Sequence, residues 1–368
     1  MRIITELENI RWDGPTVLTL GKFDGLHRGH QALICRVLEK AKELGTSPLV
    51  LSLGISRESL FSKEEKRKIL ANWGVAGHIE CPFVPAIITM EATDFVREIL
   101  VGRLHVRHIV AGPDFRFGYQ RRGDVELLKR MGRELGGSSK EVGSAGEDRK
   151  TNPGVKVSEV TCTGDETYGD SASKDGNEQR ILVTNESERE ADNSCKLDGI
   201  GNYGFTVDVI PKLREDGEII SSRRVRSLLA EGRMQEVEKL LGFPYFVSGE
   251  ILHGRRIGRT IGFPTTNLIT PPEKLLPPNG VYFVRSEVNG QEHFGITNIG
   301  TKPTVDGSFV GVETHLFELH EEIYGERQKV ELLHFARPEK RFAGLDELRD
   351  QISRDMAAAR DYFAHIEV

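Results

Sequence analysis

The first part of the chain alternates short apolar runs with longer amphipathic ones. The apolar runs predict buried strands, and the runs whose apolar residues recur every three or four positions predict helices. Strand–helix alternation favours an α/β fold with a doubly wound parallel sheet. The expected strands are 17–20, 49–53, 78–82 and 108–111, and the expected helices are 31–44, 63–73, 92–101 and 124–135.

The pattern is lost between about residues 136 and 201. This stretch is rich in Gly, Ser, Asp, Glu and Lys and has almost no aromatic residues. It therefore buries too little apolar surface to offset the entropy of an ordered chain. We interpret it as a disordered insertion, with a hairpin between 155–160 and 181–183 as the alternative. A strand pattern resumes at 203–210.

Beyond residue 242 the pattern changes to strands separated by turn residues. Asn-Gly at 289–290 and Asp-Gly at 306–307 favour tight hairpins. Strands in close succession predict a small antiparallel β-barrel, and an amphipathic helix over 344–363 follows it. We therefore expect two domains, 1–241 and 242–368. The expected strands of the second are 246–252, 280–287, 292–298, 311–317 and 328–335.

Composition narrows the class of protein. The chain has 368 residues, enough for two domains with cores of their own. Its 38% hydrophobic and 29% charged residues are typical of a soluble globular protein. A net charge of −6 argues against a general nucleic-acid-binding protein. No apolar stretch is long enough for a membrane span and the first residues lack a signal-peptide core, so we expect a cytoplasmic protein.

A glycine-rich turn follows the strand at 17–20. Residues 21–30 read Gly-Lys-Phe-Asp-Gly-Leu-His-Arg-Gly-His and run into the helix pattern. Free N–H groups at a helix N-terminus bind anions. His27 and His30, three residues apart, would face the same anion. The turn therefore indicates a phosphate site, against the alternative of a plain strand–helix connection.

The second half carries another basic, glycine-rich segment, GRRIGRTIGFPTTNL at 254–268. The Thr265 hydroxyl and the Asn267 side-chain oxygen are hard ligands suited to Mg²⁺ beside phosphate. Glu313 lies in an apolar strand, where a carboxylate fits a general base. An outward-facing strand glutamate is the alternative for Glu313, and a Pro-stiffened turn is the alternative for the segment.

Two further segments of the first half fit phosphate or ring binding. Phe115 and Arg116 lie in an aromatic, basic loop that suits stacking and phosphate contact, or else a hydrophobic plug with surface arginines. Ser221 and Ser222 precede a helix that they are expected to cap, while Arg226 is placed to meet a triphosphate.

These motifs, in this order, resemble the prokaryotic bifunctional riboflavin kinase/FAD synthetase family over almost all of the chain except 136–201. The resemblance implies a nucleotidylyltransferase domain that transfers AMP from ATP to FMN, and a barrel that phosphorylates riboflavin with ATP and Mg²⁺. It implies catalytic roles for His27, His30 and Glu313, and magnesium binding by Thr265 and Asn267. It implies nucleotide binding by Gly21, Phe23, Asp24, Gly25, Gly29, Ser221, Ser222, Arg226, Gly254, Gly258, Gly262, Thr265, Asn267 and Tyr324, and flavin binding by Phe115, Arg116, Arg337, Lys340 and Phe342.

The chain departs from the family pattern at two positions of the first half. Arg223 stands where the family usually has threonine, and 54–56 read Gly-Ile-Ser where the family continues into Pro-His-Pro. One alternative is therefore a riboflavin kinase whose adenylyltransferase domain is weak or inactive. Another nucleotidylyltransferase is disfavoured by the second domain, and a non-catalytic flavin-binding regulatory protein by the presence of Thr265, Asn267 and Glu313.

Overall fold

The structure is a computed structural model that describes most of the chain. It describes residues 1–6, 8–54, 58–81, 84–136, 203–252, 262–304, 307–319 and 323–365. The predicted insertion lies outside the described residues, apart from residue 136. The chain divides into two compact units, Met1–Ile55 with Lys66–Ile219 and Ser56–Glu65 with Ile220–Val368.

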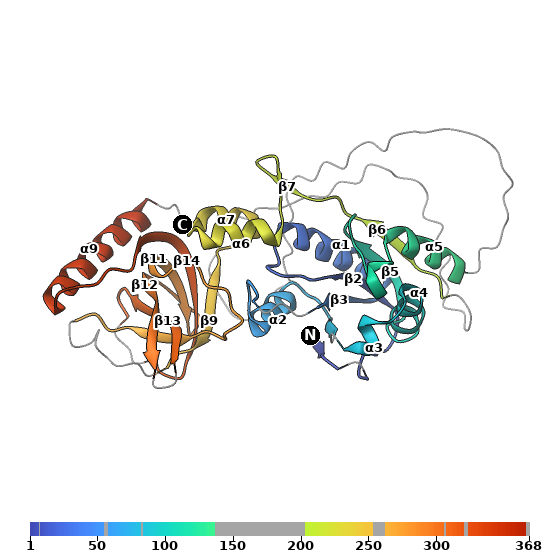
Figure 1. The fold of residues 1–368 in the computed structure, drawn as a ribbon, viewed down its shortest axis with the longest axis horizontal. Helices are drawn as coiled ribbons and strands as arrows, with labels where there is room; N and C mark the ends of the chain where they lie inside the picture. The colour runs from blue at the N-terminus through green and yellow to red at the C-terminus, as the bar shows by residue number, and fades with distance from the viewer. Residues whose placement is uncertain are drawn as a thin grey trace. The chain divides into compact units, whose positions relative to one another are not determined.

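The first unit is built on a six-stranded parallel sheet in the order β1-β4-β3-β2-β5-β6 (Figure 1). The order reverses beside β2, since β3 and β4 extend the sheet to one side and β5 and β6 to the other. Ligands of such sheets bind beyond the carboxyl ends of the strands at this reversal. The strands are β1 (Arg2–Ile4), β2 (Thr16–Gly21), β3 (Ser47–Leu53), β4 (Gly77–Cys81), β5 (Val106–Ala111) and β6 (Thr206–Val209).

Helices cover both faces of this sheet, so its central strands are continuous apolar runs. Val17 and Val50 pack toward α1 and α2, whereas Leu18 and Leu49 belong to the larger core on the opposite face. That core includes Phe95 and its neighbours on η1, which continues α4. The helices are α1 (Arg28–Leu44), α2 (Lys63–Asn72), α3 (Pro85–Ile88), α4 (Ala92–Asp94), η1 (Phe95–Val101) and α5 (Val125–Leu135).

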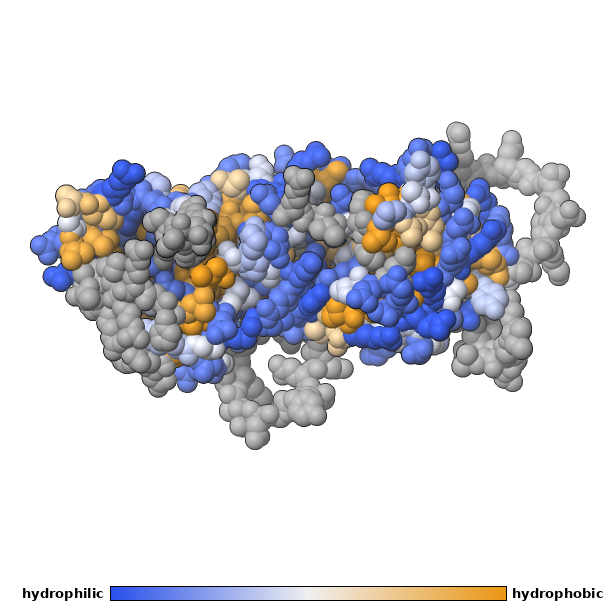
Figure 2. Space-filling model, turned by 60° about the horizontal axis from the view of Figure 1, so that its bottom comes forward, coloured by the Kyte–Doolittle hydropathy of each residue, from blue (hydrophilic) through white to orange (hydrophobic). Residues whose placement is uncertain are grey.

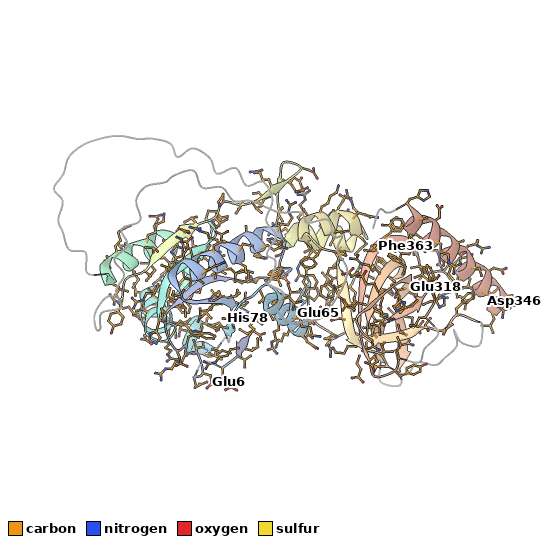
Figure 3. The ribbon with its side chains drawn as sticks, turned by 180° about the vertical axis from the view of Figure 1, so that it is seen from behind. Glu6, Glu65, His78, Glu318, Asp346 and Phe363 are labelled. Carbon is orange, nitrogen blue, oxygen red and sulfur yellow. The ribbon has the colours of Figure 1, made fainter. Side chains whose placement is uncertain are left out.

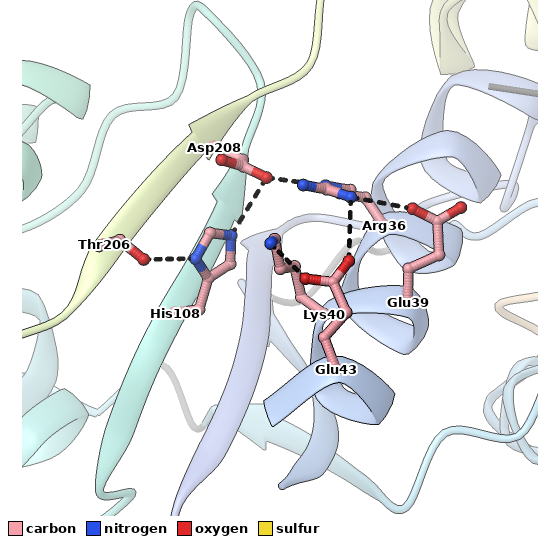
Figure 4. Close-up of polar contacts among 7 residues, drawn as sticks. All are labelled: Arg36, Glu39, Lys40, Glu43, His108, Thr206 and Asp208. Atoms are coloured by element: carbon pink, nitrogen blue, oxygen red, sulfur yellow. Dashed lines mark hydrogen bonds and ion pairs between the residues drawn. The ribbon is translucent and has the colours of Figure 1, made fainter. Parts of the chain in front are cut away.

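The edge strand β6 is attached to its neighbours by a polar network (Figure 4). The Arg36 Nε of α1 donates to an Asp208 carboxylate oxygen at 2.7 Å, and the His108 Nε2 lies 3.3 Å from the same oxygen. The His108 Nδ1 is 2.6 Å from the Thr206 Oγ1. The neighbouring His108 ring and Arg36 guanidinium hold the pKa of Asp208 well below its usual range.

We expect Asp208→Asn to lower the free energy of unfolding at neutral pH. The same substitution should make the free energy of unfolding decrease less as the pH falls. Because the pKa of Asp208 is depressed by folding, its stabilisation is present above the unfolded pKa of about 3.9 and is lost as pH falls through the folded pKa. The loss at neutral pH should be about 1 kcal/mol, because the carboxylate is partly exposed and screened. Urea unfolding between about pH 2 and 7 measures both effects.

The matched control for this prediction is Asp346→Asn in α9 (Leu345–Ala364), whose carboxylate is fully exposed (Figure 3). An Asp208→Asn protein with the same pH dependence of unfolding as the unaltered chain would contradict the assignment of this network.

The second unit is an antiparallel sheet of six strands in the order β10-β13-β12-β11-β14-β9. The Leu252 N–H, just beyond β9, donates to the Asn267 carbonyl of β10 at 2.9 Å, so the sheet nearly closes into the expected barrel. Asn289 and Gly290 have the positive φ angles, 52° and 74°, of a tight hairpin turn. The strands are β9 (Phe246–Glu250), β10 (Thr266–Ile269), β11 (Gly280–Val288), β12 (Gln291–Thr304), β13 (Gly307–Leu316) and β14 (Arg327–Pro338).

Helix α9 packs on the outside of this barrel. Ala359 of α9 is fully buried against Val281, Phe283 and Ile296. The ring of Phe363, which is labelled in Figure 3, stacks on Phe294 with centroids 4.5 Å apart. The unit also contains helices α6 (Ser222–Ala230) and α7 (Met234–Leu241). On the face drawn in Figure 2, exposed apolar residues form small separate groups, which is ordinary for a protein surface.

A short segment that precedes α2 in sequence belongs to the second unit. The Ser59 N–H donates to the Glu273 carbonyl at 2.7 Å, and the Leu275 N–H donates to the Ser59 carbonyl at 2.8 Å. At the end of the segment, the Glu65 carboxylate and the Lys274 ammonium form an ion pair at 2.7 Å (Figure 3). Both side chains are almost fully buried, with exposed fractions of 2% and 1%.

Candidate active sites

The turn between β2 and α1 is held in an unusual conformation by buried side chains. Phe23 and Leu26 have positive φ angles of 44° and 45°, and both are fully buried. Such angles cost energy for side chains of this size and persist only where packing enforces them. A Cβ on Gly21 would lie 3.3 Å from the Phe23 ring, so a side chain there would crowd it. Within the described residues, Gly21 and Phe23 thus shape the predicted phosphate loop.

The two histidines of this turn lie together at the start of α1. His27 is the N-cap residue, and its ring stacks on that of His30 with centroids 3.8 Å apart. Burial lowers the pKa of His27 to about 4, although the charge of Asp24 opposes this shift. Burial, together with the charges of His27 and Lys66, also holds the pKa of His30 well below its usual value. Both rings are therefore neutral at neutral pH when no anion is bound.

The arrangement suits an anion. The Nδ1 atoms of His27 and His30 are buried and have no hydrogen-bond partner within the described parts of the chain. An anion nearby favours the protonated, donating form of each ring. The N-terminus of α1 lies beside them, with Gly29 in its first turn, and this turn follows β2 where the strand order reverses. Asp24 and Gly25 lie in the same turn, and Gly25 has a φ of 88°.

The other predicted residues of the first unit have structural partners. The Phe115 ring stacks on Phe117 at 5.5 Å and packs against the core. Arg116 forms an ion pair at 2.8 Å with Asp124, which caps α5 by accepting from the Leu127 N–H at 2.9 Å. Flavin binding by Phe115 and Arg116 stays a prediction.

Ser221, Ser222 and Arg226 lie at the start of α6, in the second unit. The Ser221 hydroxyl caps the helix by accepting from the Arg224 N–H at 3.4 Å. Arg226 donates to the Glu58 carbonyl at 2.7 Å, and Arg223 is exposed. The expected cap is thus present, and nucleotide binding by these residues stays a prediction.

The predicted kinase residues form a row across three neighbouring strands. Asn267 of β10 pairs in register with Glu313 of β13, which pairs with Asn298 of β12. Residues in register share one face, with Cβ atoms about 4.5–5.5 Å apart. Thr266 and Thr314, which alternate with them, are buried within the barrel, so Asn267 and Glu313 point outward. Thr265 directly precedes β10, two residues before Asn267.

This outward side is the one that α9 partly covers. Ile296 of β12, two residues before Asn298, packs with Ala359 of α9. The row therefore continues the surface on which α9 lies. A glutamate beside a side-chain amide and a threonine hydroxyl provides oxygen donors for a cation and a base for a hydroxyl group.

The loop after β14 is attached to α9 and to β12. Arg337 donates to both oxygens of the Asp355 carboxylate, at 3.0 and 2.7 Å, and this carboxylate is nearly buried. Lys340 pairs with Glu347 at 3.1 Å and lies over the Phe342 ring. Flavin contacts by Arg337, Lys340 and Phe342 stay predictions.

Four predicted nucleotide-binding residues complete the kinase set. Gly254 and Gly258 lie outside the described residues, and Gly262 has a φ of 88°. Tyr324 is half-buried in the turn before β14.

Sequence reasoning missed Glu339 in the loop after β14. Its carboxylate accepts from the Asn279 amide at 3.2 Å, and a Cβ on Gly300 would lie 2.1 Å from its Oε1. A side chain at position 300 would therefore displace the Glu339 carboxylate, and no local pattern signals this contact.

The fold and these two sites are those of a two-part transferase that acts on phosphate groups. The family model for riboflavin kinase matches residues 241–363, and that for FAD synthetase matches 10–153. The bifunctional riboflavin kinase/FMN adenylyltransferase of Escherichia coli strain K12 is 31% identical over 358 residues, covering 94% of this chain and 92% of its own. That of Pseudomonas fluorescens is 30% identical over 371 residues, covering 98% and 97%. The chain belongs to the bifunctional riboflavin kinase/FMN adenylyltransferase family.

A solved structure shows the same overall fold. The crystal structure of a macrolide-efflux protein from Streptococcus pneumoniae matches with a TM-score of 0.71 and 23% identity, over 98% of this chain and 99% of that one. At this identity the likeness concerns the fold alone. No helix among the described residues is long and apolar enough to cross a membrane.

Proposed function

We propose that residues 242–368 carry out the kinase step and residues 1–241 the adenylyltransferase step of this bifunctional enzyme. The chain phosphorylates riboflavin to FMN with ATP and adenylylates FMN to FAD. The presence of both family matches on one chain, each over its own set of predicted catalytic residues, carries this assignment. We place both reactions in the cytoplasm.

In the kinase step, Glu313 accepts the proton of the riboflavin 5′-hydroxyl while that oxygen attacks the γ-phosphorus of ATP. The bond from the γ-phosphorus to the bridging oxygen breaks, and ADP leaves. The oxygen atoms of Thr265 and Asn267 fit Mg²⁺, since both are hard donors, Asn267 is paired with Glu313, and Thr265 lies two residues before Asn267. When bound, Mg²⁺ neutralises phosphate charge.

In the adenylyltransferase step, a phosphate oxygen of FMN attacks the α-phosphorus of a second ATP, and pyrophosphate leaves. The step needs no covalent enzyme intermediate, only positioning and hydrogen-bond donors aimed at the developing charge. His27, His30 and the α1 N-terminus supply such donors. The two rings are neutral without an anion, and the triphosphate raises their affinity for protons.

A chromatographic time course of riboflavin, FMN and FAD with ATP and Mg²⁺ tests the proposal. FMN followed by FAD is the expected result and would mean that Arg223 is tolerated. FMN alone would identify a riboflavin kinase with an inactive first domain. Neither product would favour a non-catalytic flavin-binding protein.

We expect His30→Ala to lower the rate of FAD formation from FMN by about 10²-fold, the usual effect of removing one donor to transition-state charge. FMN formation from riboflavin should be unchanged, since His30 lies in the first unit. Initial rates with each flavin measure the two steps separately.

The control for this variant is His105→Asn in the same unit. His105 is exposed and has a φ of 50°, which asparagine tolerates. Full FAD synthesis by His30→Ala would remove this histidine from the mechanism.

A further inference from the structure

A histidine of β13 contacts the backbone that carries the proposed magnesium ligands. His315 lies two residues after Glu313, on the same side of the strand. Its Nδ1 is 2.8 Å from the Pro264 carbonyl oxygen, and Pro264 directly precedes Thr265. One side chain therefore links the strand of the proposed base to the segment of the proposed metal ligands.

The partner of this bond defines the protonation of the ring. A carbonyl oxygen only accepts hydrogen bonds, so the His315 Nδ1 must carry the proton and donate. Burial, aided by the Arg360 charge, lowers the pKa of His315, although the bond to Pro264 opposes the shift. At neutral pH the ring is therefore neutral, with its proton on Nδ1 and its Nε2 unprotonated.

Aromatic rings hold His315 in this orientation. The Phe263 ring meets the His315 ring edge-on, with centroids 5.7 Å apart. The Phe317 ring also meets it edge-on, with centroids 6.2 Å apart. The Arg360 guanidinium of α9 lies over Phe317 at 5.1 Å. The ring is thus packed on a rigid strand, while Phe263 and Pro264 lie outside any strand.

Among the described residues, few contacts reach this segment apart from the Pro264 bond and the contact of the Phe263 ring with His315. Outside the strand ladder, no second hydrogen bond reaches residues 262–265 from the described parts of the chain. Pro264 has no N–H to donate, so its carbonyl is the group by which a neighbour can hold it. The distance from Thr265 to the row of Asn267 and Glu313 therefore depends on this bond.

We propose that His315 is a positioning residue of the kinase site, which holds the Pro264 carbonyl and so places the Thr265 oxygen for Mg²⁺ and the nucleotide phosphates. This inference rests on the proposed function of the barrel and deepens it. His315 touches neither substrate nor metal, and it acts through Thr265.

The protonation state is tested without substrate or metal. Long-range ¹H–¹⁵N correlation spectra of the full chain, labelled at histidine, distinguish a proton on Nδ1 from one on Nε2. The His315 signals are assigned by their loss in His315→Asn. We expect the Nδ1-protonated neutral form, and an Nε2-protonated ring would overturn the proposal.

The positioning role is tested by three substitutions at the same position. Asparagine places an N–H near the former Nδ1, glutamine places it near the former Nε2, and phenylalanine keeps the ring without a donor. His315→Phe and His315→Gln should raise the Mg²⁺ concentration for half-maximal kinase rate, and the KM for ATP, about three- to tenfold, as expected for one lost hydrogen bond. His315→Asn should stay within about twofold of the unaltered chain, and kcat should change less than KM in all three.

The matched control is His365→Phe. The His365 Nδ1 also bonds a backbone carbonyl, that of Asp361 at 2.7 Å, but at the end of α9. The His365→Phe variant should leave the Mg²⁺ dependence of the kinase unchanged. The rate of FMN adenylylation should be unchanged in every variant. Thermal unfolding of each variant reports on folding. If phenylalanine destabilises the barrel, the comparison of His315→Asn with His315→Gln still tests the positioning role.

The outcomes separate this inference from the function on which it rests. Equal Mg²⁺ dependence in the Asn and Gln variants, with normal kinase activity in the unaltered chain, would overturn the positioning role alone. Absence of kinase activity in the unaltered chain would overturn the proposed function and this inference together.

Discussion

Replacing Glu313 by glutamine is expected to lower riboflavin phosphorylation by about 10²–10⁴-fold, the usual contribution of a positioned general base. Glutamine keeps the size and the hydrogen-bonding oxygen of the side chain, but it cannot accept the proton of the 5′-hydroxyl. The conversion of FMN to FAD should be intact, because the barrel does not contain His27 or His30. Initial rates of FMN and FAD formation, measured separately by chromatography, test both parts.

Glu287→Gln is the matched control, since Glu287 is an exposed strand glutamate of the same barrel, on β11. It should leave both activities within about twofold, as surface substitutions usually do. A Glu313→Gln protein that retains kinase activity within tenfold of the control would exclude Glu313 as the base. Loss of both activities would count against separate sites.

Replacing Lys274 by methionine is expected to destabilise the second unit by about 3–5 kcal/mol, the usual effect of removing one partner from a buried ion pair. The Glu65 carboxylate would keep the Ser62 and Ser248 N–H groups, at 2.8 and 2.9 Å, but would lose its counter-ion. The Lys274 ammonium also lies 4.4 Å from the Tyr245 ring centroid, so a cation–π contact would be lost. Calorimetric unfolding and the thermal inactivation of the kinase measure the effect.

A second substitution should restore most of the stability that Lys274→Met removes. Combining Lys274→Met with Glu65→Leu removes both charges, and an apolar pair of similar volume is often as stable as a buried ion pair. About 1 kcal/mol should remain, because Glu65 also caps α2 through the Ser62 N–H.

Arg327→Met is the matched control for Lys274→Met. Arg327 pairs with Glu64, the neighbour of Glu65, and both of these side chains are largely exposed. Its cost should be below about 1 kcal/mol. Equal effects of Lys274→Met and Arg327→Met would show that burial of the Glu65–Lys274 pair adds nothing to stability.

The sequence predicted the elements whose pattern is local and strong. The four expected strands of the sheet, the barrel hairpin at Asn289-Gly290 and the helix at 344–363 were all confirmed, with ends shifted by a few residues. Strands β1 and β6 lie at the two edges of the sheet, and the three-residue β1 was missed because so short a run carries no period. Helix α7 was also missed, although Met234, Val237 and Leu241 have helical spacing.

Partners that lie far apart in the sequence could not be predicted. Glu65 and Lys274 are 209 residues apart, and neither position has a local pattern that marks it as buried. The side of the barrel to which Glu313 points could not be predicted either. It depends on the register of β10 and β12 with β13. The charges of Arg116 and Arg337 were evident from the sequence, but the carboxylates that pair with them, Asp124 and Asp355, were not.

The division of the chain into two units determines what a single proteolytic cleavage would separate. The chain enters the second unit at Ser56, returns to the first at Lys66 and enters the second again at Ile220, so it crosses between them three times. A single cleavage after Ile219 would leave the ion-pair partner of Lys274 on the N-terminal fragment. Such a cut would divide the polypeptide within the second unit, and the two fragments should co-purify through the Glu65–Lys274 pair and the hydrogen bonds of Ser59.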